Sequence, residues 1–449
     1  MELRDYQEED VNYLLGRASA GIFNEQRTGK TPTSLTVMKR KNVQKLLIVC
    51  PSTLMYNWYR EVKLWYNPDC TIHVITSKKK YRDNYKNIQA NVYIINYENI
   101  RGSKSDDSLS TLLLSNKFDG LIVDEVHRCK NRKSNNFEAI NKLNSIPNRL
   151  YLTGTPAPNN QWEVWSILHF INPVLFRSYW DFTRTYFRIK SLPVANRFIE
   201  QPVGFKAGME LRLQLLLNEY AVNRKRSDIM QYATAPEPTI IKLELTKEQK
   251  RYISELEEWF ETEDVMTQGV LDNLIRIRQV CTAPALLNLK GASPKINWFK
   301  QIQKDYKDKQ IVVFSNSRKF LCMLEDNCSL SHARIDGSVP IMKRGEFVDT
   351  FQNCEIQILL CQTQACKEGL TLDRADISIF MDTYPPASDY QQARDRIVAV
   401  SEDNVREQML FHVMMADSYD EHLYELVDRN IVLTDVINDY KNYLEKRRN

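Results

Sequence analysis

Two short segments of the sequence carry residue types that could bind and hydrolyse a nucleotide. The first is NEQRTGKT, residues 24–31, which follows a short apolar piece around Ile22 and opens a predicted helix. Backbone N–H groups at a helix N-terminus bind phosphate, and a lysine beside them neutralises the β- and γ-phosphate oxygens. We therefore predict that Thr28, Gly29 and Lys30 bind ATP and that the Thr31 hydroxyl helps to coordinate Mg²⁺.

The second segment is DEVH, residues 124–127, which directly follows the apolar run GLIV. Both carboxylates should therefore emerge at the C-terminal end of a buried strand. In phosphoryl-transfer enzymes such a pair divides the work, so Asp124 is predicted to hold Mg²⁺ and Glu125 to polarise the attacking water. His127 joins them as a candidate catalytic residue.

The match to a phosphate loop is imperfect at two positions. Asn24 occupies the place of the first glycine in the pattern GxxxxGK[ST], and Arg27 stands where many related loops have another glycine. Gln7, shortly before the loop in LRDYQ, could read the adenine edge through its side-chain amide. A glutamine on its own, without a phosphate loop nearby, would not indicate a nucleotide-binding site.

The elements that must position these residues follow from the pattern of apolar runs. Runs that are apolar throughout, separated by helix-length polar stretches, indicate parallel strands covered on both faces. The predicted strands are residues 45–50, 71–76, 91–96, 120–125 and 149–154, and then 310–315, 357–362 and 376–382. Ligands of such sheets bind beyond the carboxyl ends of the strands, which is where the two motifs fall.

The stretch between these two groups of strands, residues 173–289, lacks strand alternation and has helical spacing, as in LTKEQKRYISELEEWF. We therefore predict an α/β fold of two RecA-like parallel-sheet lobes with a helical insertion between them. The predicted domains are residues 1–172 (lobe one, binding ATP), 173–290 (helical insertion or linker) and 291–449 (lobe two).

The composition restricts the class of protein more than it defines its function. A chain of 449 residues suits two or three domains, and its net charge of +4 is too small to indicate a nucleic-acid partner. No apolar run approaches the ~20 residues of a membrane span, and the N-terminus is too polar for a secretory signal. The cysteines and histidines show neither zinc-ligand nor disulfide spacing, so we expect a cytoplasmic protein without a structural metal.

Beyond the two motifs, a series of ordered segments covering nearly the whole chain resembles the SNF2 branch of helicase superfamily 2. The segments are LLIVCPSTLMYNWYREVKLW (46–65), IINYENI (94–100), DEVHRCKN (124–131), LTGTPAPNNQWEVWSILHFINP (152–173), LTKEQKRYISEL (245–256), LIRIRQVCTAPALL (274–287), IVVFSNSRKFLCMLE (311–325), RIDGSVPIMKRGEFVDTF (334–351) and CKEGLTLDRADISIFMDTYPPASDYQQARDR (366–396). The resemblance implies a DNA-dependent ATPase or helicase that uses ATP and Mg²⁺ and acts on double-stranded DNA.

The chain departs from the family pattern in its last two motifs. Members usually carry QAxDRxHRxGQ, whereas residues 392–399 read QARDRIVA, so Arg396 keeps the first arginine and Ala399 replaces the second. The resemblance implies catalytic roles for Gln392 and for Arg396, which should contact the γ-phosphate, although Arg394 or another basic side chain could substitute. Gly369 remains as a candidate nucleotide contact where Cys366 and Lys367 replace other glycines.

The resemblance also implies where DNA should bind. Motors of this kind grip the sugar-phosphate backbone across both lobes, which positions the protein without reading sequence. The candidate contacts are Ser52, Trp58, Asn96, Tyr97 and Asn159 in lobe one, and Ser317, Arg318, Gly337, Ser338 and Thr363 in lobe two. Trp58 and Tyr97 could equally be core aromatics.

Three functions remain open on the sequence. The first is a translocase or helicase on branched or forked DNA, since the chain resembles small phage-encoded branch-migration helicases in size and fork-remodelling helicases in GLTLDRAD. The second is a translocase that tracks along duplex DNA without strand separation, and the third is a silenced DNA-binding scaffold. We expect a monomer in a bacterial or phage-infected cell. The basic residues Arg184, Arg188, Lys190, Arg197 and Lys206 could form a second DNA contact or could simply pack between the lobes.

Overall fold

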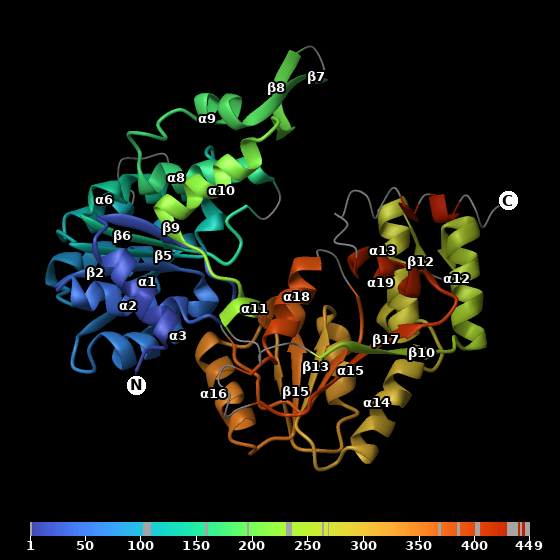
Figure 1. Ribbon diagram of the computed structural model, residues 1–449. Coiled ribbons are helices and arrows are strands. Elements are labelled where there is room, and N and C mark those ends of the chain that lie inside the picture. Colours follow the sequence, from blue (N-terminus) through green and yellow to red (C-terminus); the bar gives the residue numbers. More distant parts are fainter. Residues whose placement is uncertain are drawn as a thin grey trace. The chain divides into compact units, whose positions relative to one another are not determined.

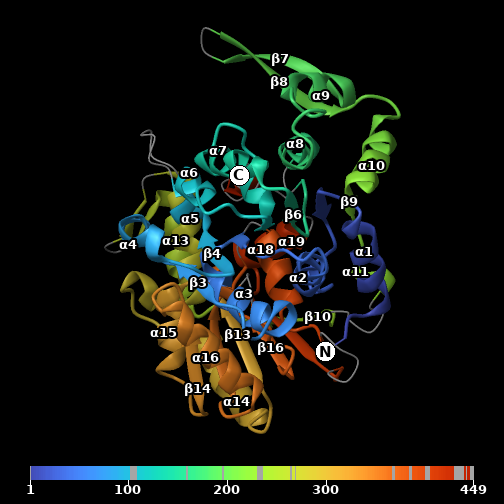
Figure 2. The same cartoon turned by 90° about the vertical axis from the view of Figure 1, so that its left-hand side faces the viewer.

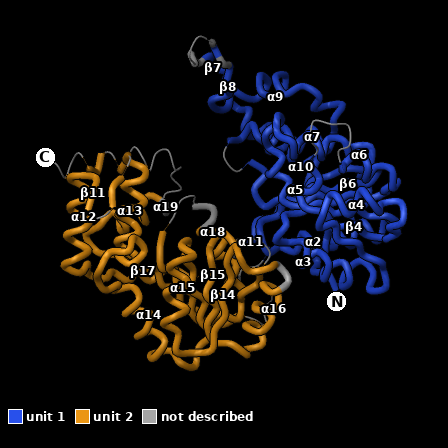
Figure 3. The backbone as a smooth tube through the Cα atoms, turned by 180° about the vertical axis from the view of Figure 1, so that it is seen from behind, with its two compact units in different colours: residues 1–231 blue, residues 232–449 orange. Residues whose placement is uncertain are grey.

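The computed structural model describes residues 2–101, 109–157, 160–194, 197–229, 236–262, 265–267, 269–366, 370–383, 387–399, 405–428, 439–440 and 442–444. The chain divides into two compact units, residues 1–231 and 232–449 (Figure 3). Each unit is built on its own parallel sheet. The prediction of two parallel-sheet α/β lobes is therefore confirmed.

The sheet of the first unit has seven strands in the order β3-β4-β2-β5-β6-β1-β9, and all neighbouring strands are parallel. Helices cover both faces of this sheet, as is usual for a parallel sheet. The sequences of its strands are therefore apolar at nearly every position. The strands are β1 (Ser19–Ile22), β2 (Leu46–Cys50), β3 (Ile72–Ile75), β4 (Val92–Asn96), β5 (Gly120–Asp124), β6 (Asn148–Leu152) and β9 (Ala221–Val222).

Alternate residues of each strand enter two separate cores, one on each face of this sheet. Leu47 and Val49 of β2 belong to one core, and Leu46 and Ile48 belong to the other. The second core is completed by α1 (Asp5–Leu15), α2 (Lys30–Arg40) and α3 (Met55–Glu61). The first core is completed mainly by α5 (Tyr97–Ile100), α6 (Leu109–Leu114), α7 (Asn135–Asn141) and α8 (Trp165–Ile171).

A separate antiparallel hairpin belongs to the first unit and extends away from its sheet in both views (Figures 1 and 2). It consists of β7 (Phe187–Val194) and β8 (Arg197–Phe205). Helices α9 (Tyr179–Tyr186) and α10 (Met209–Tyr220) flank it in the chain, and β9 then returns to the edge of the sheet. Helices α4 (Lys78–Asn84) and α11 (Arg226–Ile229) complete the α-helices described in this unit.

The sheet of the second unit has six parallel strands in the order β10-β17-β16-β13-β15-β14. They are β10 (Pro238–Leu243), β13 (Ile311–Ser315), β14 (His332–Ile335), β15 (Ile358–Gln362), β16 (Ile377–Phe380) and β17 (Met409–Met415). The unit's longer helices are α12 (Lys247–Trp259), α13 (Val270–Thr282), α14 (Pro294–Asp305), α15 (Arg318–Glu325), α16 (Ile341–Gln352), α18 (Ala387–Asp395) and α19 (Tyr419–Asp428), with short α17 (Thr363–Cys366) and the pair β11 (Glu261–Thr262) and β12 (Val265–Met266).

The stretch 173–289 differs from the expected helical insertion. It contains α9, α10, α12 and α13, but it also forms the β7–β8 hairpin and supplies β9 and β10 to the edges of the two sheets. The two compact units divide this stretch at residue 231. Its strands escaped the sequence analysis because β9 is only two residues long and the hairpin strands mix apolar, basic and proline residues.

Within the part of the chain that is described, no helix is both long enough and apolar enough to cross a lipid bilayer.

Candidate nucleotide and DNA site

Three adjacent strands of the first unit bring the predicted nucleotide residues to one edge of the sheet. Strands β5, β6 and β1 are neighbours and parallel, so their carboxyl ends lie side by side. DEVH follows β5, Thr153-Gly154-Thr155 follows β6, and the phosphate loop follows β1. A β-carbon built on Gly154 would lie 3.4 Å from the backbone nitrogen of Gln26 and 3.6 Å from Nζ of Lys30. The segment after β6 is therefore in contact with the phosphate loop, and it also meets DEVH, because Nδ1 of His127 lies 3.0 Å from Oγ1 of Thr153.

The phosphate loop has the backbone shape that its sequence predicts. Gly29 is the N-cap of α2 with φ of +74°, a left-handed conformation that favours glycine. Nζ of Lys30 donates to the carbonyls of Asn24 (2.9 Å) and Glu25 (3.0 Å), and the buried Thr28 hydroxyl donates to the Glu25 carbonyl (2.8 Å). Arg27 also has positive φ, +66°, which explains why glycine is common at this place in related loops.

The unusual Asn24 has a structural role that the sequence did not reveal. Its buried side chain donates from Nδ2 to Oδ2 of Asp10 at 2.7 Å and accepts from the backbone N–H of Arg224 at 2.9 Å. Nε of Arg224 in turn donates to Oδ1 of Asp10 at 2.9 Å. Burial raises the pKa of Asp10, and the hydrogen bonds from Asn24 and Arg224 oppose this rise. Asp10 and Arg224 therefore hold the start of the phosphate loop in place. This role of Asp10 could not be predicted, because nothing in the sequence distinguishes it from an ordinary acidic residue of a helix.

Gln7 is packed against the phosphate loop. Its Oε1 accepts from the backbone of Arg4 at 2.9 Å, and its Nε2 donates to the carbonyl of Thr28 at 3.4 Å. A β-carbon on Gly29 would lie 1.9 Å from this Nε2, so the absence of a side chain at Gly29 makes room for Gln7. The structure thus brings Gln7 to the predicted nucleotide residues, and its reading of the adenine edge stays a prediction.

Asp124 ends β5 and is held by several groups of the first unit. Nε1 of Trp58 donates to its Oδ2 at 2.8 Å, and the backbone N–H of Glu125 donates to its Oδ1 at 2.9 Å. The Tyr97 hydroxyl donates to the Asp124 backbone carbonyl at 2.6 Å. The side chain is therefore fixed at the strand end before any ligand arrives.

The electrostatic setting of Asp124 suits a group that binds a cation. Burial, and then the nearby Glu125 carboxylate, raise the pKa of Asp124 to about 7, while the Trp58 hydrogen bond and the charge of Lys30 act in the opposite direction. A carboxylate and a hydroxyl are the hard oxygen ligands that Mg²⁺ prefers. Asp124 and Thr31 therefore fit the predicted magnesium ion, which would restore the anionic form of Asp124 and supply charge for the bound phosphates.

His127 links DEVH to the segment after β6. Its Nδ1 lies 3.1 Å from Oε2 of Glu125 and 3.0 Å from Oγ1 of Thr153. The same Thr153 oxygen accepts from the backbone N–H of Thr155 at 3.1 Å. A change at the Glu125 carboxylate can therefore reach the Thr153–Thr155 turn through one imidazole ring.

Two of the predicted DNA contacts of lobe one require correction. Trp58 and Tyr97 are fully buried, and their polar atoms are directed at Asp124. They position the carboxylate and are not exposed to DNA. Ser52 and Asn96 are half-buried. The Oδ1 of Asn96 caps α5 by accepting from the backbone nitrogen of Asn99 at 2.8 Å. Asn159 lies outside the described residues.

The predicted DNA contacts of lobe two lie on three neighbouring strand ends of the second sheet. Ser317 and Arg318 follow β13, Gly337 and Ser338 follow β14, and Thr363 follows β15. Gln362 joins the three loops, because its Oε1 accepts from the Gly337 nitrogen at 3.1 Å and its Nε2 donates to the Asn316 carbonyl at 3.3 Å. Arg318, Gly337 and Ser338 are exposed, whereas Thr363 is buried.

The last motif lies on and just after α18. Gln392 and Arg396 are half-buried, and Gly369 lies outside the described residues. Nη2 of Arg394 donates to the carbonyl of Pro236 at 3.1 Å, and its guanidinium lies 5.8 Å from the Tyr390 ring centroid. Arg394 is thus engaged in packing within the second unit, and the assignment of the phosphate arginine to Arg396 stays a prediction.

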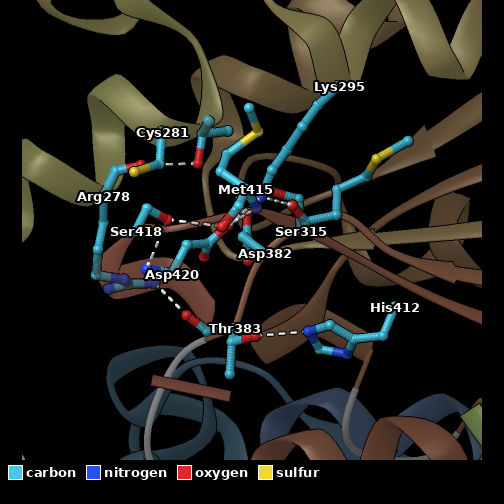
Figure 4. A network of polar contacts seen from close by, with 12 residues as sticks. Arg278, Cys281, Lys295, Ser315, Asp382, Thr383, His412, Met415, Ser418 and Asp420 are labelled. Atoms are coloured by element: carbon cyan, nitrogen blue, oxygen red, sulfur yellow. Dashed lines mark hydrogen bonds and ion pairs between the residues drawn. The ribbon is translucent and has the colours of Figure 1, made fainter. Parts of the chain in front are cut away.

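A buried polar network supports this edge of the second unit (Figure 4). Asp382, just beyond β16, accepts from the Ser315 hydroxyl and from the backbone N–H of Asn316, and so fixes the start of the loop that carries Ser317. Thr383 bonds His412 at 2.6 Å, and burial lowers the pKa of that histidine to about 3. Nearby, the buried Lys295 ammonium lies 2.7 Å from Asp420. None of these contacts was foreseen from the sequence.

Among the described residues, no group of three or more histidine, cysteine or acidic side chains is arranged to hold a metal ion. Free thiols are found at Cys50, Cys70, Cys129, Cys281, Cys322, Cys328, Cys354 and Cys361. The expected lack of a structural metal stays a prediction.

Comparisons with known proteins agree with the order of these motifs. The SNF2-related domain matches residues 6–286, and the helicase conserved C-terminal domain matches residues 294–400. The SWI/SNF-related matrix-associated actin-dependent regulator of chromatin subfamily A member 1 of Mus musculus is 25% identical over 492 residues, covering 100% of this chain and 44% of that protein. The chromodomain-helicase-DNA-binding protein 3 homolog of Caenorhabditis elegans is 26% identical, covering 97% of this chain and 26% of that protein.

The chain therefore spans less than half the length of these relatives. Among solved structures, the Sulfolobus solfataricus SWI2/SNF2 ATPase core in complex with dsDNA is 21% identical with a TM-score of 0.45, covering 95% of this chain and 91% of that one.

The hydrogen bond from Trp58 predicts a change in pH dependence. As pH falls through about 7, Asp124 takes up a proton and loses its capacity for Mg²⁺, so Mg²⁺ affinity and turnover should fall on the acid side. Trp58→Phe removes a donor to the charged form, worth ~1.5–3 kcal/mol. The acid limb should therefore move to higher pH by about one unit or more.

The measurement is Mg²⁺-dependent nucleotide binding and hydrolysis from pH 5.5 to 9. Trp259→Phe, at an exposed position of the second unit, is the matched control and should leave the profile unchanged. An acid limb that is the same in Trp58→Phe as in the native chain would show that the indole does not set the Asp124 pKa.

Proposed function

The chain belongs to the SNF2-related family, and from this premise we propose that it is an ATP-driven, DNA-stimulated motor that acts on branched or forked duplex DNA. The observation that carries the proposal is the meeting of Lys30, Asp124, Glu125 and Thr153 at adjacent strand ends. Its relatives are described as chromatin regulators and helicases, a description that belongs to those longer proteins. Kinship with small phage-encoded branch-migration helicases is part of the proposal.

In this proposal, different residues of the first unit have different roles in ATP hydrolysis. Lys30 would neutralise phosphate oxygens, and the position of its ammonium within the loop supports this role. Thr31 and Asp124 would hold Mg²⁺, and Glu125 would orient the attacking water. His127 and Thr153 connect Glu125 to the turn ahead of the predicted DNA contact Asn159. This connection offers a route by which nucleotide state and DNA binding could influence each other.

The second unit would supply the γ-phosphate arginine and half of the DNA grip. Closure of the lobes on ATP and reopening after hydrolysis would shift one lobe along the strand in each cycle. Contacts to phosphates ignore sequence, so such a motor can move on any DNA. We further propose that it acts as a monomer in the cytoplasm of a bacterial or phage-infected cell.

The first prediction concerns hydrolysis. Lys30→Ala should abolish turnover, because it removes the cation at the phosphates. Glu125→Gln should keep nucleotide binding but stop hydrolysis, because the amide cannot polarise water. Steady-state phosphate release and nucleotide binding, each with and without duplex DNA, are the measurements. Equal hydrolysis by the native chain in the presence and absence of DNA would contradict the motor.

The second prediction separates the two arginines of the last motif. Arg396→Ala should lower turnover by ~10³-fold, the order expected for a γ-phosphate arginine. Arg394→Ala should instead lower the free energy of unfolding by about 1–2 kcal/mol, through loss of its bond to the Pro236 carbonyl, with a smaller effect on turnover. Urea unfolding and single-turnover hydrolysis distinguish the two effects. An inactive Arg394 variant of native stability would transfer the role from Arg396 to Arg394.

The third prediction concerns the DNA substrate. ATP-dependent processing of a four-way junction should be faster than displacement of a third strand from linear duplex. The rival function, tracking along duplex DNA to displace proteins or to serve a nuclease, predicts the reverse order. Triplex displacement with no junction processing would establish the rival.

A further inference from the structure

The β7–β8 hairpin is anchored in the core of the first unit through the residues at its base. Phe187 is fully buried, its ring stacks on Phe205 with centroids 4.7 Å apart, and Trp162 meets it edge-on at 5.9 Å. Further along the hairpin, Phe198 is 78% exposed. An isolated two-stranded hairpin has little stability of its own in water. The stacked rings of Phe187 and Phe205 therefore fix the base of the hairpin to the core of the first unit.

The two faces of the ribbon differ in chemistry. Opposite residues of an antiparallel pair share a face, so Lys190 lies with Gln201 on one face. Phe198 is three residues before Gln201 on β8 and therefore lies on the other face. Arg188, two residues before Lys190, shares the basic face. A β-strand rises ~3.3 Å per residue, so β7 reaches about 23 Å from its first residue to its last.

The charge of the hairpin is unbalanced. Residues 187–206 contain Arg188, Lys190, Arg197 and Lys206 but one acidic residue, Glu200. That Glu200 is paired with Arg184 of α9 at 3.0 Å, and the Lys206 ammonium is bound to the Arg184 carbonyl. Within the described residues, the side chains of Arg188 and Lys190 are exposed and make no hydrogen bond or ion pair. Two unneutralised cations therefore remain on the basic face.

We propose that this hairpin divides the two arms of branched DNA, with Arg188 and Lys190 against the phosphates of one arm and Phe198 stacked on the base pair at the branch point. The inference rests on the proposed function and names the element that would make it specific for branches. Charge complementarity selects DNA as the occupant, since exposed Arg and Lys side chains bind phosphate and an exposed aromatic ring stacks on an unpaired or terminal base. A linear duplex offers Phe198 an open base-pair face only at its two ends, whereas a branch point offers one in the interior of the DNA.

The test compares variants of the two faces. Arg188→Gln/Lys190→Gln removes the cations, and its matched control is Lys300→Gln/Lys304→Gln on exposed positions of α14. Phe198→Ala removes the ring, Phe198→Trp restores one, and Leu215→Ala, 59% exposed on α10, is the apolar control. Each protein is assayed for binding to a four-way junction over a range of salt, for junction processing, and for ATPase stimulated by linear duplex.

The double charge variant should bind the junction severalfold more weakly, and the slope of log affinity against log salt should fall by about two. Phe198→Ala should process the junction at least about fivefold more slowly, by the loss of one stacked base, and Phe198→Trp should recover the rate. A 2-aminopurine placed in the branch-point base pair should change fluorescence with the native chain and with Phe198→Trp but not with Phe198→Ala. Linear-duplex ATPase should stay within about twofold of native in all variants.

Junction binding and processing at native levels in both hairpin variants would overturn the proposal, as would an equal loss on linear duplex. Failure of the proposed function itself would be distinct, since the native chain would then hydrolyse ATP at the same rate with and without DNA.

Discussion

A buried carboxylate at the end of a central strand is the constraint on which the rest of the first unit depends. Burial disfavours the charged form of Asp124, and Glu125 beside it adds repulsion, so the charge needs partners. Trp58 of α3 donates to the side chain, Tyr97 of α5 donates to the carbonyl, and Lys30 adds a positive charge. Helices α3 and α5, which pack on opposite faces of the sheet, therefore both form hydrogen bonds with Asp124. A site that binds a cation can keep this arrangement, because the ion supplies the missing charge.

The order of the strands brings the other nucleotide-site residues next to Asp124. With β5, β6 and β1 adjacent, the segments that follow them meet at one edge although they lie far apart in sequence. Strand β9 then pairs with β1, and the chain beyond it runs along the phosphate loop, where the Arg224 carbonyl accepts from Glu25 at 2.9 Å. Asn24 and Asp10 complete this attachment. The loop of this chain is therefore braced by side chains at a position where related loops have glycine.

The fold and the nucleotide motifs were predictable because they depend on local patterns. Uniformly apolar runs located β2 to β6, β13, β15 and β16 within a residue or two, and the strand-end positions of Lys30 and Asp124 followed from them. The partners of these residues were not predictable, because Trp58 and Tyr97 reach Asp124 only through the packing of α3 and α5. The sequence around an aromatic residue does not show whether its side chain faces DNA or a buried carboxylate. The hairpin was missed for a related reason, because its strands mix apolar, basic and proline residues and are not uniformly apolar.

The anchoring of the hairpin has a mechanical consequence for a two-lobed motor. Phe187 at its base belongs to the same hydrophobic core as Val126, which lies between Glu125 and His127, and as Tyr97, which bonds the Asp124 carbonyl. Protein cores are close-packed and transmit displacement with little compression. The hairpin is therefore carried by the unit that holds the phosphate loop. A stepwise movement of the first unit along DNA would advance the hairpin by the same distance, so that an element dividing the arms of a branch would be driven forward by the same cycle that hydrolyses ATP.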